Sequence, residues 1–201
     1  MKRFPQKHFY HIAEPSNLES ILKHGLLSAE RLMGAVLKGT ALRTTLREQR
    51  IRNLVLPNGI IIRDQWRIPP RALTRALPPD ITPSDWYRFL NGFVFLWPTR
   101  ERVDRHLPAF EVRPQKLLVI DAMRLLKEKS EELFLSPINS GNAMRHAAPR
   151  SYQLFVPYNE WLDKGWPTIQ EHARPRSTAP AEIAIKGHLP LERFLVEVRD
   201  A

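Results

Sequence analysis

The stretch from Phe9 to Ser28 constrains the fold more than any other part of the sequence. A short apolar and aromatic run ends in His11-Ile12-Ala13, which is typical of a β-strand. Ser16 and Glu19 follow with the spacing of a capping box at the start of a helix. Apolar residues then recur on one helical face as far as Gly25, a residue type that commonly ends helices. The sequence therefore predicts a strand, a turn and a helix at the beginning of the fold.

Capping residues and apolar runs predict the remaining elements. Helices are expected at 28–38, where Ser28 is the N-cap and Gly39 ends the helix, and at 42–51 and 83–91. Two more are expected at 99–106, capped by Thr99, and at 122–129, capped by Asp121. Strands are expected at 93–97, 116–120, 133–135, 152–156, 181–185 and 194–198. The proline-rich segment 69–83 predicts an irregular connector with at most one helical turn. This order predicts an α+β fold, in which helices pack on a mixed or antiparallel sheet and residues 1–201 form one domain.

The composition limits the classes of function. The chain has 201 residues, no cysteine, and 31 lysines and arginines against 21 acidic residues, a net charge of +10. The absence of cysteine excludes disulfides and thiolate chemistry, and we expect a cytoplasmic protein because neither a secretory signal nor a membrane span is visible. The positive charge favours a polyanionic partner such as DNA or RNA, although a soluble protein can also be basic without one.

Three segments resemble the DarT-type ADP-ribosyltransferases. The first is Tyr10-His11-Ile12 with the following Asn17-Leu18-Glu19-Ser20-Ile21-Leu22 and Gly25-Leu26-Leu27. The second is Pro180-Ala181-Glu182-Ile183-Ala184-Ile185, and the third is the aromatic run Gly92 to Trp97, which precedes Pro98 and Arg100. The resemblance implies an ADP-ribosyltransferase-like split sheet. The 136–150 loop has no counterpart in the DarT pattern. Two positions before Glu182 stands Pro180, where many transferases that modify arginine or asparagine in proteins have Gln or Glu.

The resemblance also implies roles for individual residues. Glu182 takes the place of the catalytic glutamate. Arg63 lies in the region where these enzymes have an essential arginine, and Arg52 or Arg67 fits that role equally well. The residues expected to bind the cofactor are His11, Ile12, Asn17, Leu18 and Trp97. By its resemblance the chain is expected to use NAD as a substrate, to modify nucleic acid, and to act as a bacterial toxin or phage-defence effector with an antitoxin or immunity protein.

Arginine-rich segments provide the expected contacts to nucleic acid, because arginine binds phosphate in a bidentate manner. The residues assigned to this surface are Arg43, Arg47, Arg67, Arg145 and Arg150. Such runs are also common on solvated faces that bind nothing.

Each assignment has an alternative. His11 also fits a core histidine, Glu182 an edge-strand residue and the aromatic run an ordinary core strand. No histidine or acidic spacing predicts a metal site, so none is expected. Two other functions stay open, a non-catalytic nucleic-acid-binding module of the same fold and a metal-independent ribonuclease in which a histidine is the base.

Overall fold

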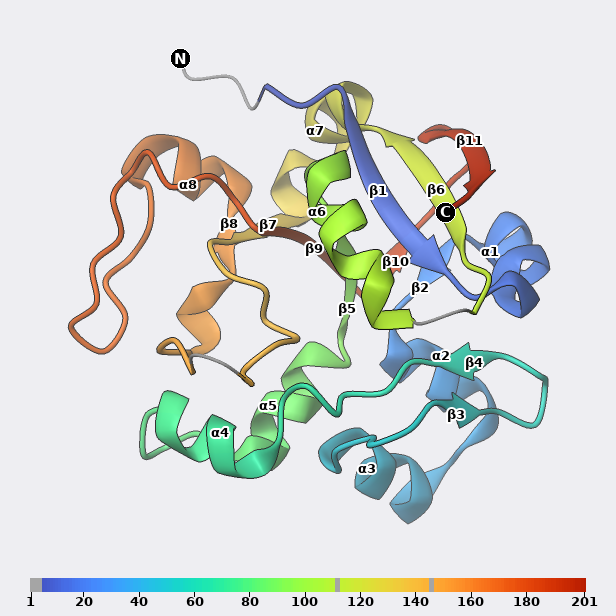
Figure 1. Cartoon of the computed structure of the whole chain (residues 1–201), viewed down its shortest axis with the longest axis horizontal. Helices are drawn as coiled ribbons and strands as arrows, with labels where there is room; N and C mark the ends of the chain where they lie inside the picture. The colour runs from blue at the N-terminus through green and yellow to red at the C-terminus, as the bar shows by residue number, and fades with distance from the viewer. Residues whose placement is uncertain (1–4, 111–112, 145–146) are drawn as a thin grey trace.

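A three-stranded antiparallel sheet forms one half of the centre of the molecule (Figure 1). The computed structural model describes residues 5–110, 113–144 and 147–201. The strands of this sheet are β1 (His8–Ala13), β6 (Lys116–Asp121) and β11 (Leu195–Asp200), in the order β1-β6-β11. The middle strand is the most apolar, and its residues 117–120 are at most 3% exposed, as expected for a strand with a neighbour on each side.

A four-stranded antiparallel sheet forms the other half. Its strands are β5 (Phe93–Leu96), β9 (Glu182–Lys186), β7 (Leu133–Ser136) and β8 (Val156–Pro157), in the order β5-β9-β7-β8. Strand β9 lies between β5 and β7, and its first residue, Glu182, pairs with Ser136 at the last position of β7. Glu182 therefore lies at the end of the sheet, where the chain enters and leaves through loops.

The two sheets meet at a bridge between Tyr10 of β1 and Trp97, the residue that follows β5. Tyr10 N–H donates to the carbonyl oxygen of Trp97 at 2.9 Å, and Trp97 N–H donates to that of Tyr10 at 2.7 Å. The largest apolar cluster includes Phe9 and Leu118 from the first sheet and Leu96 and Ile183 from the second, so both sheets share a core. The predicted α+β architecture with antiparallel sheets is confirmed.

Helices and short strands surround these sheets. The helices are α1 (Leu18–His24), α2 (Ala29–Val36), α3 (Gly39–Arg47), α4 (Pro70–Ala76), α5 (Pro83–Leu90), α6 (Arg100–His106), α7 (Ala122–Lys129) and α8 (Tyr158–Lys164). The short strands pair as β2 (Leu26–Leu27) with β10 (His188–Leu189) and β3 (Leu54–Val55) with β4 (Ile61–Ile62). The 3₁₀ turns are Pro15–Asn17, Leu107–Phe110, Ser130–Glu132 and Tyr152–Leu154. None of the helices in the described ranges has the length and apolar character needed to cross a membrane.

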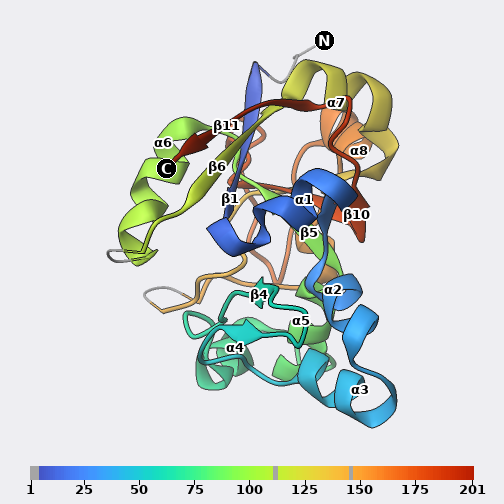
Figure 2. The same ribbon diagram turned by 90° about the vertical axis from the view of Figure 1, so that its right-hand side faces the viewer.

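Helices α3, α4 and α5 and the β3–β4 hairpin form a group below the two sheets, which we call the lower lobe (Figures 1 and 2). An aromatic cluster attaches this lobe to the four-stranded sheet. Phe93 of β5 stacks on Phe155 with ring centroids 5.2 Å apart, and Phe89 of α5 meets both rings edge-on at 5.0 and 5.3 Å. Such aromatic pairs contribute about 0.5–1.5 kcal/mol each beyond the burial of their surface.

Local signals predicted several helix ends. Gly25 follows α1 with a φ of +74°, and a Cβ there would lie only 2.4 Å from the carbonyl oxygen of Leu189, so a side chain does not fit. The side chains of Ser28, Thr99 and Asp121 accept hydrogen bonds at the starts of α2, α6 and α7. These caps are where the sequence predicted them.

Other elements differ from the prediction. Residues Pro15–Asn17 form a 3₁₀ turn, α1 begins at Leu18, and the expected Ser16–Glu19 capping box is absent. Segment 69–83 contains α4, whose Ala72, Leu73 and Ala76 are buried, because Pro70 occupies the first helical turn where its missing N–H costs nothing. Residues 152–156 form a 3₁₀ turn and only the beginning of β8.

Candidate active site

A cavity of about 350 Å³ lies where the two sheets part. Its walls include β1, β5, the first residue of β9, the 139–141 loop, residues of α1, α2 and α6, and the 60–68 segment, which contains β4. The volume is within the range of pockets that bind small molecules. Among the residues that line it, His11 and Glu182 stand on strands from different sheets, so the structure brings these two predicted site residues to one cavity.

His11 projects from β1 at the split between the sheets. Its Nδ1 lies 2.9 Å from the carbonyl oxygen of Phe95 on β5, and because a carbonyl only accepts, Nδ1 carries the proton. Burial lowers the pKa of His11 to about 4, the hydrogen bond to Phe95 opposes this effect, and the charge of Arg63 adds to it. The imidazole is therefore neutral at pH 7, and its Nε2 is a hydrogen-bond acceptor.

Glu182 is a buried carboxyl, 5% exposed, at the start of β9. Burial raises its pKa to about 7, against the effect of hydrogen bonds from the hydroxyl and backbone N–H of Ser140 and of the positive charges of Arg150 and Arg102. The Ser140 hydroxyl donates to Oε2 at 2.7 Å. The carboxyl thus titrates near neutral pH inside a cavity, which is typical of functional sites.

Arg63 follows β4 and is held in a polar network on the cavity wall. Its Nε lies 3.7 Å from Oε1 of Glu14, and its guanidinium also donates to the side chain of Gln115. Gln115 in turn donates to Oε2 of Glu14 at 3.2 Å, and Arg113 lies 3.7 Å from Oε1. Burial lowers the pKa of Arg63 to about 10, so it stays cationic at neutral pH and brings a fixed positive charge to the cavity.

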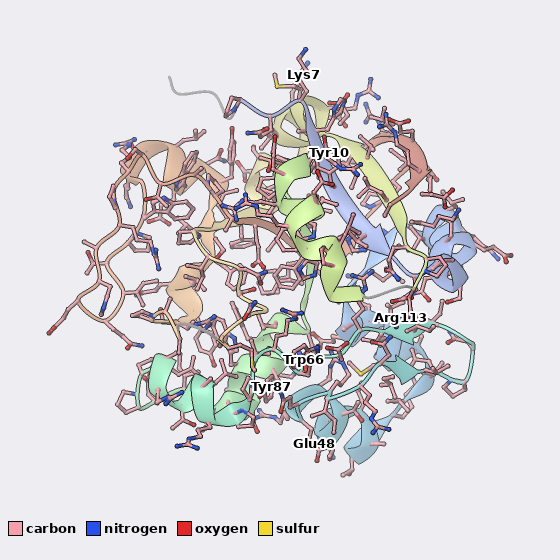
Figure 3. The ribbon with its side chains drawn as sticks, viewed as in Figure 1. Lys7, Tyr10, Glu48, Trp66, Tyr87 and Arg113 are labelled. Carbon is pink, nitrogen blue, oxygen red and sulfur yellow. The ribbon has the colours of Figure 1, made fainter. Side chains whose placement is uncertain are left out.

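Several cavity residues were not predicted, among them Arg50, Trp66 and His106. Arg50 donates from Nε to the carbonyl of Arg63 at 3.0 Å, and its buried NH1 has no hydrogen-bond partner among the described residues. Trp66 is 44% exposed, and the guanidinium of Arg67 lies 4.7 Å above its ring. Figure 3 shows Trp66 between the sheets and the lower lobe. His106, the last residue of α6, also lines the cavity, and burial together with the charges of Arg63 and Arg67 lowers its pKa to about 4.

The other predicted cofactor residues have different positions. Trp97 lines the cavity, and its ring centroid lies 4.8 Å from that of His106. Asn17 also borders the cavity, but its amide binds the backbone of Ile61 through both its donor and its acceptor, at 2.8 and 2.9 Å. Its side chain thus attaches β4 to the start of α1.

Ile12 and Leu18 are mainly core residues. Ile12 borders the cavity but is only 4% exposed and packs with Val103 and Leu117. Leu18 packs against the core shared by the two sheets and lies outside the cavity lining.

The arginines predicted to bind nucleic acid do not form one group. Arg67 is at the cavity, and Arg43 and Arg47 are exposed on α3, where Arg47 contacts Asp85 at 2.8 Å. Arg150 is only 1% exposed, so its assignment to an exposed surface is wrong. Its guanidinium bonds carbonyl oxygens of its own loop. Arg145 lies outside the described residues.

Within the described ranges, no group of three or more histidine and acidic side chains is arranged to hold a metal ion. The chemistry that these residues offer is that of a carboxyl titrating near pH 7, two neutral imidazoles and several guanidinium groups in one cavity.

Comparisons with known proteins give similar solved structures and a sequence family. No curated protein matches the sequence. A solved structure described as Thermus sp. 2.9 DarT in complex with ADP-ribosylated ssDNA is 19% identical, with a TM-score of 0.41, and the match covers 94% of this chain and 80% of that one. A likeness of this size supports no conclusion about activity. Residues 7–194 match the sequence model described as "Family of unknown function (DUF7002)", and the chain belongs to that family.

Proposed function

We propose that the protein is an NAD-dependent mono-ADP-ribosyltransferase that modifies nucleic acid. The observation that carries this proposal is the meeting of His11 and Glu182 in one cavity at the split between the two sheets. The sequence resemblance to DarT-type enzymes rests on segments that contain these same two residues. The two residues are 171 positions apart in the chain. Only the fold brings them to the same cavity.

Glu182 is the proposed catalytic residue. In the reaction the bond between nicotinamide and C1′ of the ribose breaks, its electron pair leaves with the nicotinamide nitrogen, and positive charge develops on the sugar, as in glycosyl transfer. A carboxylate that accepts a hydrogen bond from the 2′-hydroxyl stabilises this charge, and such a preorganised group contributes ~3–4 kcal/mol to the barrier. The acceptor atom then forms the new bond to C1′ and loses its proton to solvent or to a nearby base.

His11 and the cavity arginines are assigned to binding. The Nε2 acceptor of neutral His11 suits a sugar hydroxyl, which donates a hydrogen bond to it. Arg63 provides positive charge for the diphosphate, and Arg50, which donates to the carbonyl of Arg63, has an unpartnered buried NH1 beside it. Arg63 is also positioned to polarise an accepting base, as its alternative role.

The acceptor is assigned to nucleic acid on two grounds. The net charge is +10, and the exposed Trp66 with Arg67 stacked on it lies at the cavity, where an unpaired base can stack on the aromatic face. A toxin or defence role with an antitoxin or immunity partner remains a prediction from the sequence resemblance.

Two measurements test the proposal. The first is thermal unfolding with NAD, in which a specific ligand at 100 times its dissociation constant adds ~2.7 kcal/mol of stability. The second is mass spectrometry of DNA and RNA oligonucleotides after incubation with isotope-labelled NAD, with the Glu182→Gln protein as the inactive control. We expect stabilisation by NAD and a labelled ADP-ribose adduct that depends on Glu182.

Other outcomes identify the alternatives. Nucleic-acid binding without any effect of NAD would contradict the transferase and leave a binding module of the same fold. RNA cleavage in the absence of NAD, lost in a His11→Ala protein, would instead identify a metal-independent ribonuclease.

A further inference from the structure

The hydrogen bonds to the Glu182 carboxyl come from a loop and not from the neighbouring strands. Glu182 stands on β9, whereas Ser140, which donates to it at 2.7 Å, lies in the loop that leaves β7 after Ser136. Ser140 is itself only 1% exposed, so water does not replace it as a donor. The orientation and charge of the Glu182 carboxyl therefore depend on how the 139–142 turn of this loop is held.

The base of this loop is fixed by the sheet. Ala181 N–H donates to the carbonyl of Ser136 at 2.7 Å, directly before Glu182. The Ser136 hydroxyl is fully buried and donates to the carbonyl of Ile138 at 2.8 Å. These bonds explain the beginning of the loop but not its return toward β9.

Arg150 closes the loop from its far end. Its NH1 donates to the carbonyl of Ala148 and its NH2 to the carbonyl of Asn142, both at 2.6 Å. Its backbone N–H donates to the carbonyl of Ala76 at the end of α4 at 2.8 Å, which fixes Arg150 on the lower lobe. Asn142 is two residues from Ser140, so the guanidinium holds the turn that carries the Ser140 hydroxyl.

A guanidinium is suited to this role. It is planar and has several donors in a rigid fork, so it can bond two carbonyl groups at once, whereas the ammonium of lysine is a compact point charge. Arg150 is 1% exposed, and a buried charge needs compensation. The two carbonyl dipoles and the nearby charge of Glu182, which raises the pKa of Arg150 against the effect of burial, provide it.

We propose that Arg150 is a positioning residue that holds the 139–142 turn so that the Ser140 hydroxyl remains on the Glu182 carboxylate. The proposal rests on the proposed function insofar as Glu182 is the catalytic residue. The contacts themselves exist whether or not the protein transfers ADP-ribose. Ser140 favours the ionised carboxylate by a hydrogen bond to it, and Arg150 acts through Ser140 as well as by its own charge.

The test measures the ionisation of Glu182 in two ways. One is the pH profile of NAD-dependent transfer. The other needs no activity: it is the free energy of unfolding in urea from pH 5 to 8.5, in which each protein is compared with its Glu182→Gln counterpart to isolate the titration of this carboxyl. Ser140→Ala should raise the apparent pKa of Glu182 by about one unit, the size expected for loss of a hydrogen bond to a charged group.

Arg150→Lys separates position from charge. The variant keeps the positive charge but loses the fork across two carbonyls, so we expect a shift in the same direction as for Ser140→Ala. In the Ser140→Ala background, Arg150→Lys should add no further shift, because it acts through a hydroxyl that is already absent. Ser136→Ala is the matched control. It removes an equally buried hydroxyl from the last residue of β7, next to Glu182 across the strands, whose bond goes to the carbonyl of Ile138 and not to the carboxyl. It should lower stability without moving the pKa of Glu182.

Each alternative result decides the question. If the pKa of Glu182 is the same in Ser140→Ala and Ser136→Ala, the role of Ser140 is overturned. A shift by Arg150→Lys that persists without the Ser140 hydroxyl, or an Arg150→Lys protein that does not fold, would overturn the positioning role of Arg150. If unfolding gives the expected shifts in the pKa of Glu182 but no acceptor is modified, the proposed function is rejected. The roles of Ser140 and Arg150 in holding the carboxylate are then retained.

Discussion

The Nδ1 of His11 and the carbonyl oxygen of Phe95 are 2.9 Å apart and join β1 to β5 at the edge of the cavity. This contact fixes the tautomer of His11 and leaves Nε2 as an acceptor, which is the basis of its proposed role with the sugar. His11→Ala removes this acceptor. We expect a rise in the KM for NAD and weaker stabilisation by NAD, with a smaller loss of kcat, in steady-state assays and thermal titrations. A change confined to kcat would contradict a role in binding.

Glu182→Gln should have the opposite effect. Gln is nearly isosteric, so the strand still packs, but the negative charge that stabilises the developing sugar cation is lost. We expect kcat to fall by about 10²–10³-fold with little change in NAD affinity, as for other preorganised groups that act in the transition state. Glu192→Gln is the control, because Glu192 is exposed and lies outside the cavity lining. The substitution removes the same negative charge at a position away from the cavity. Wild-type turnover in Glu182→Gln would refute the catalytic role.

The raised pKa of Glu182 also predicts a pH dependence of stability. Glu182 titrates at about 7 in the folded protein and at 4.5 as a free group. Between these values the native state retains a proton that the unfolded chain has lost, so its contribution to stability is present below pH 4.5 and is lost as the pH rises through 7. Relative to Glu182→Gln, the unfolding free energy of the parent should fall by on the order of 3 kcal/mol over this window.

Urea unfolding at several pH values checks this expectation. His11 and His106 have pKa values lowered to about 4 and act in the opposite direction, losing stability as the pH falls, but both proteins contain them and their effects cancel in the comparison. A pH-independent difference between the two proteins would show that Glu182 titrates normally.

Trp66 and Arg67 are expected to contact the acceptor strand. Trp66→Ala should weaken the binding of single-stranded oligonucleotides by ~1–3 kcal/mol, the usual contribution of a base stacked on an aromatic ring, and Trp66→Phe should restore much of it. Arg67→Gln should reduce the slope of log K against log salt by about 0.7 if it contacts one phosphate of a single strand. Fluorescence anisotropy over a range of salt concentrations measures both quantities.

Lys23→Gln is the charge control for Arg67→Gln, because Lys23 is exposed on α1 and does not line the cavity. Equal salt slopes for the two variants would remove Arg67 from the nucleic-acid contacts.

Asn17 is expected to affect stability. Asn17→Ala removes both hydrogen bonds to the backbone of Ile61 and leaves part-buried groups without partners, so the unfolding free energy should fall by about 1–3 kcal/mol. Asn17→Asp keeps the acceptor for Ile61 N–H but loses the donor, and should have an intermediate effect. Denaturant titrations measure the differences, and an Asn17→Ala protein of unchanged stability would contradict the proposed link between β4 and α1.

Much of the secondary structure was predictable because its signals are local. Ser28, Thr99 and Asp121 each bond to a backbone N–H three residues away, and such contacts are encoded within one helical turn. The Ser16–Glu19 capping box failed for a non-local reason. The residue that precedes α1, Asn17, uses its side chain on Ile61, 44 positions along the chain. No spacing within the first helix reveals that contact.

The site was predictable to a different extent. His11 and Glu182 were recognisable from short motifs, and the structure brings both to the cavity. Ser140, Arg50 and His106 lie in segments whose roles depend on where loops and helices pack, and no local pattern marks them. Arg150 shows the limit most clearly, since the composition of its segment indicates an exposed basic loop whereas the fold buries its guanidinium. The net charge is a property of the whole chain and does not tell which of its arginines are exposed.

The single bridge between Tyr10 and Trp97 has a consequence for motion. Within each sheet a strand is held along its length, as β6 is by β1 and β11. Between the sheets, this bridge and the His11 contact are complemented by apolar packing, which is non-directional and tolerates small sliding. We therefore expect this junction to open more readily than either ladder. The amide protons of Tyr10 and Trp97 would report this opening, exchanging with solvent faster than those of Leu118 and Val119 and slowing when a ligand spans both sheets.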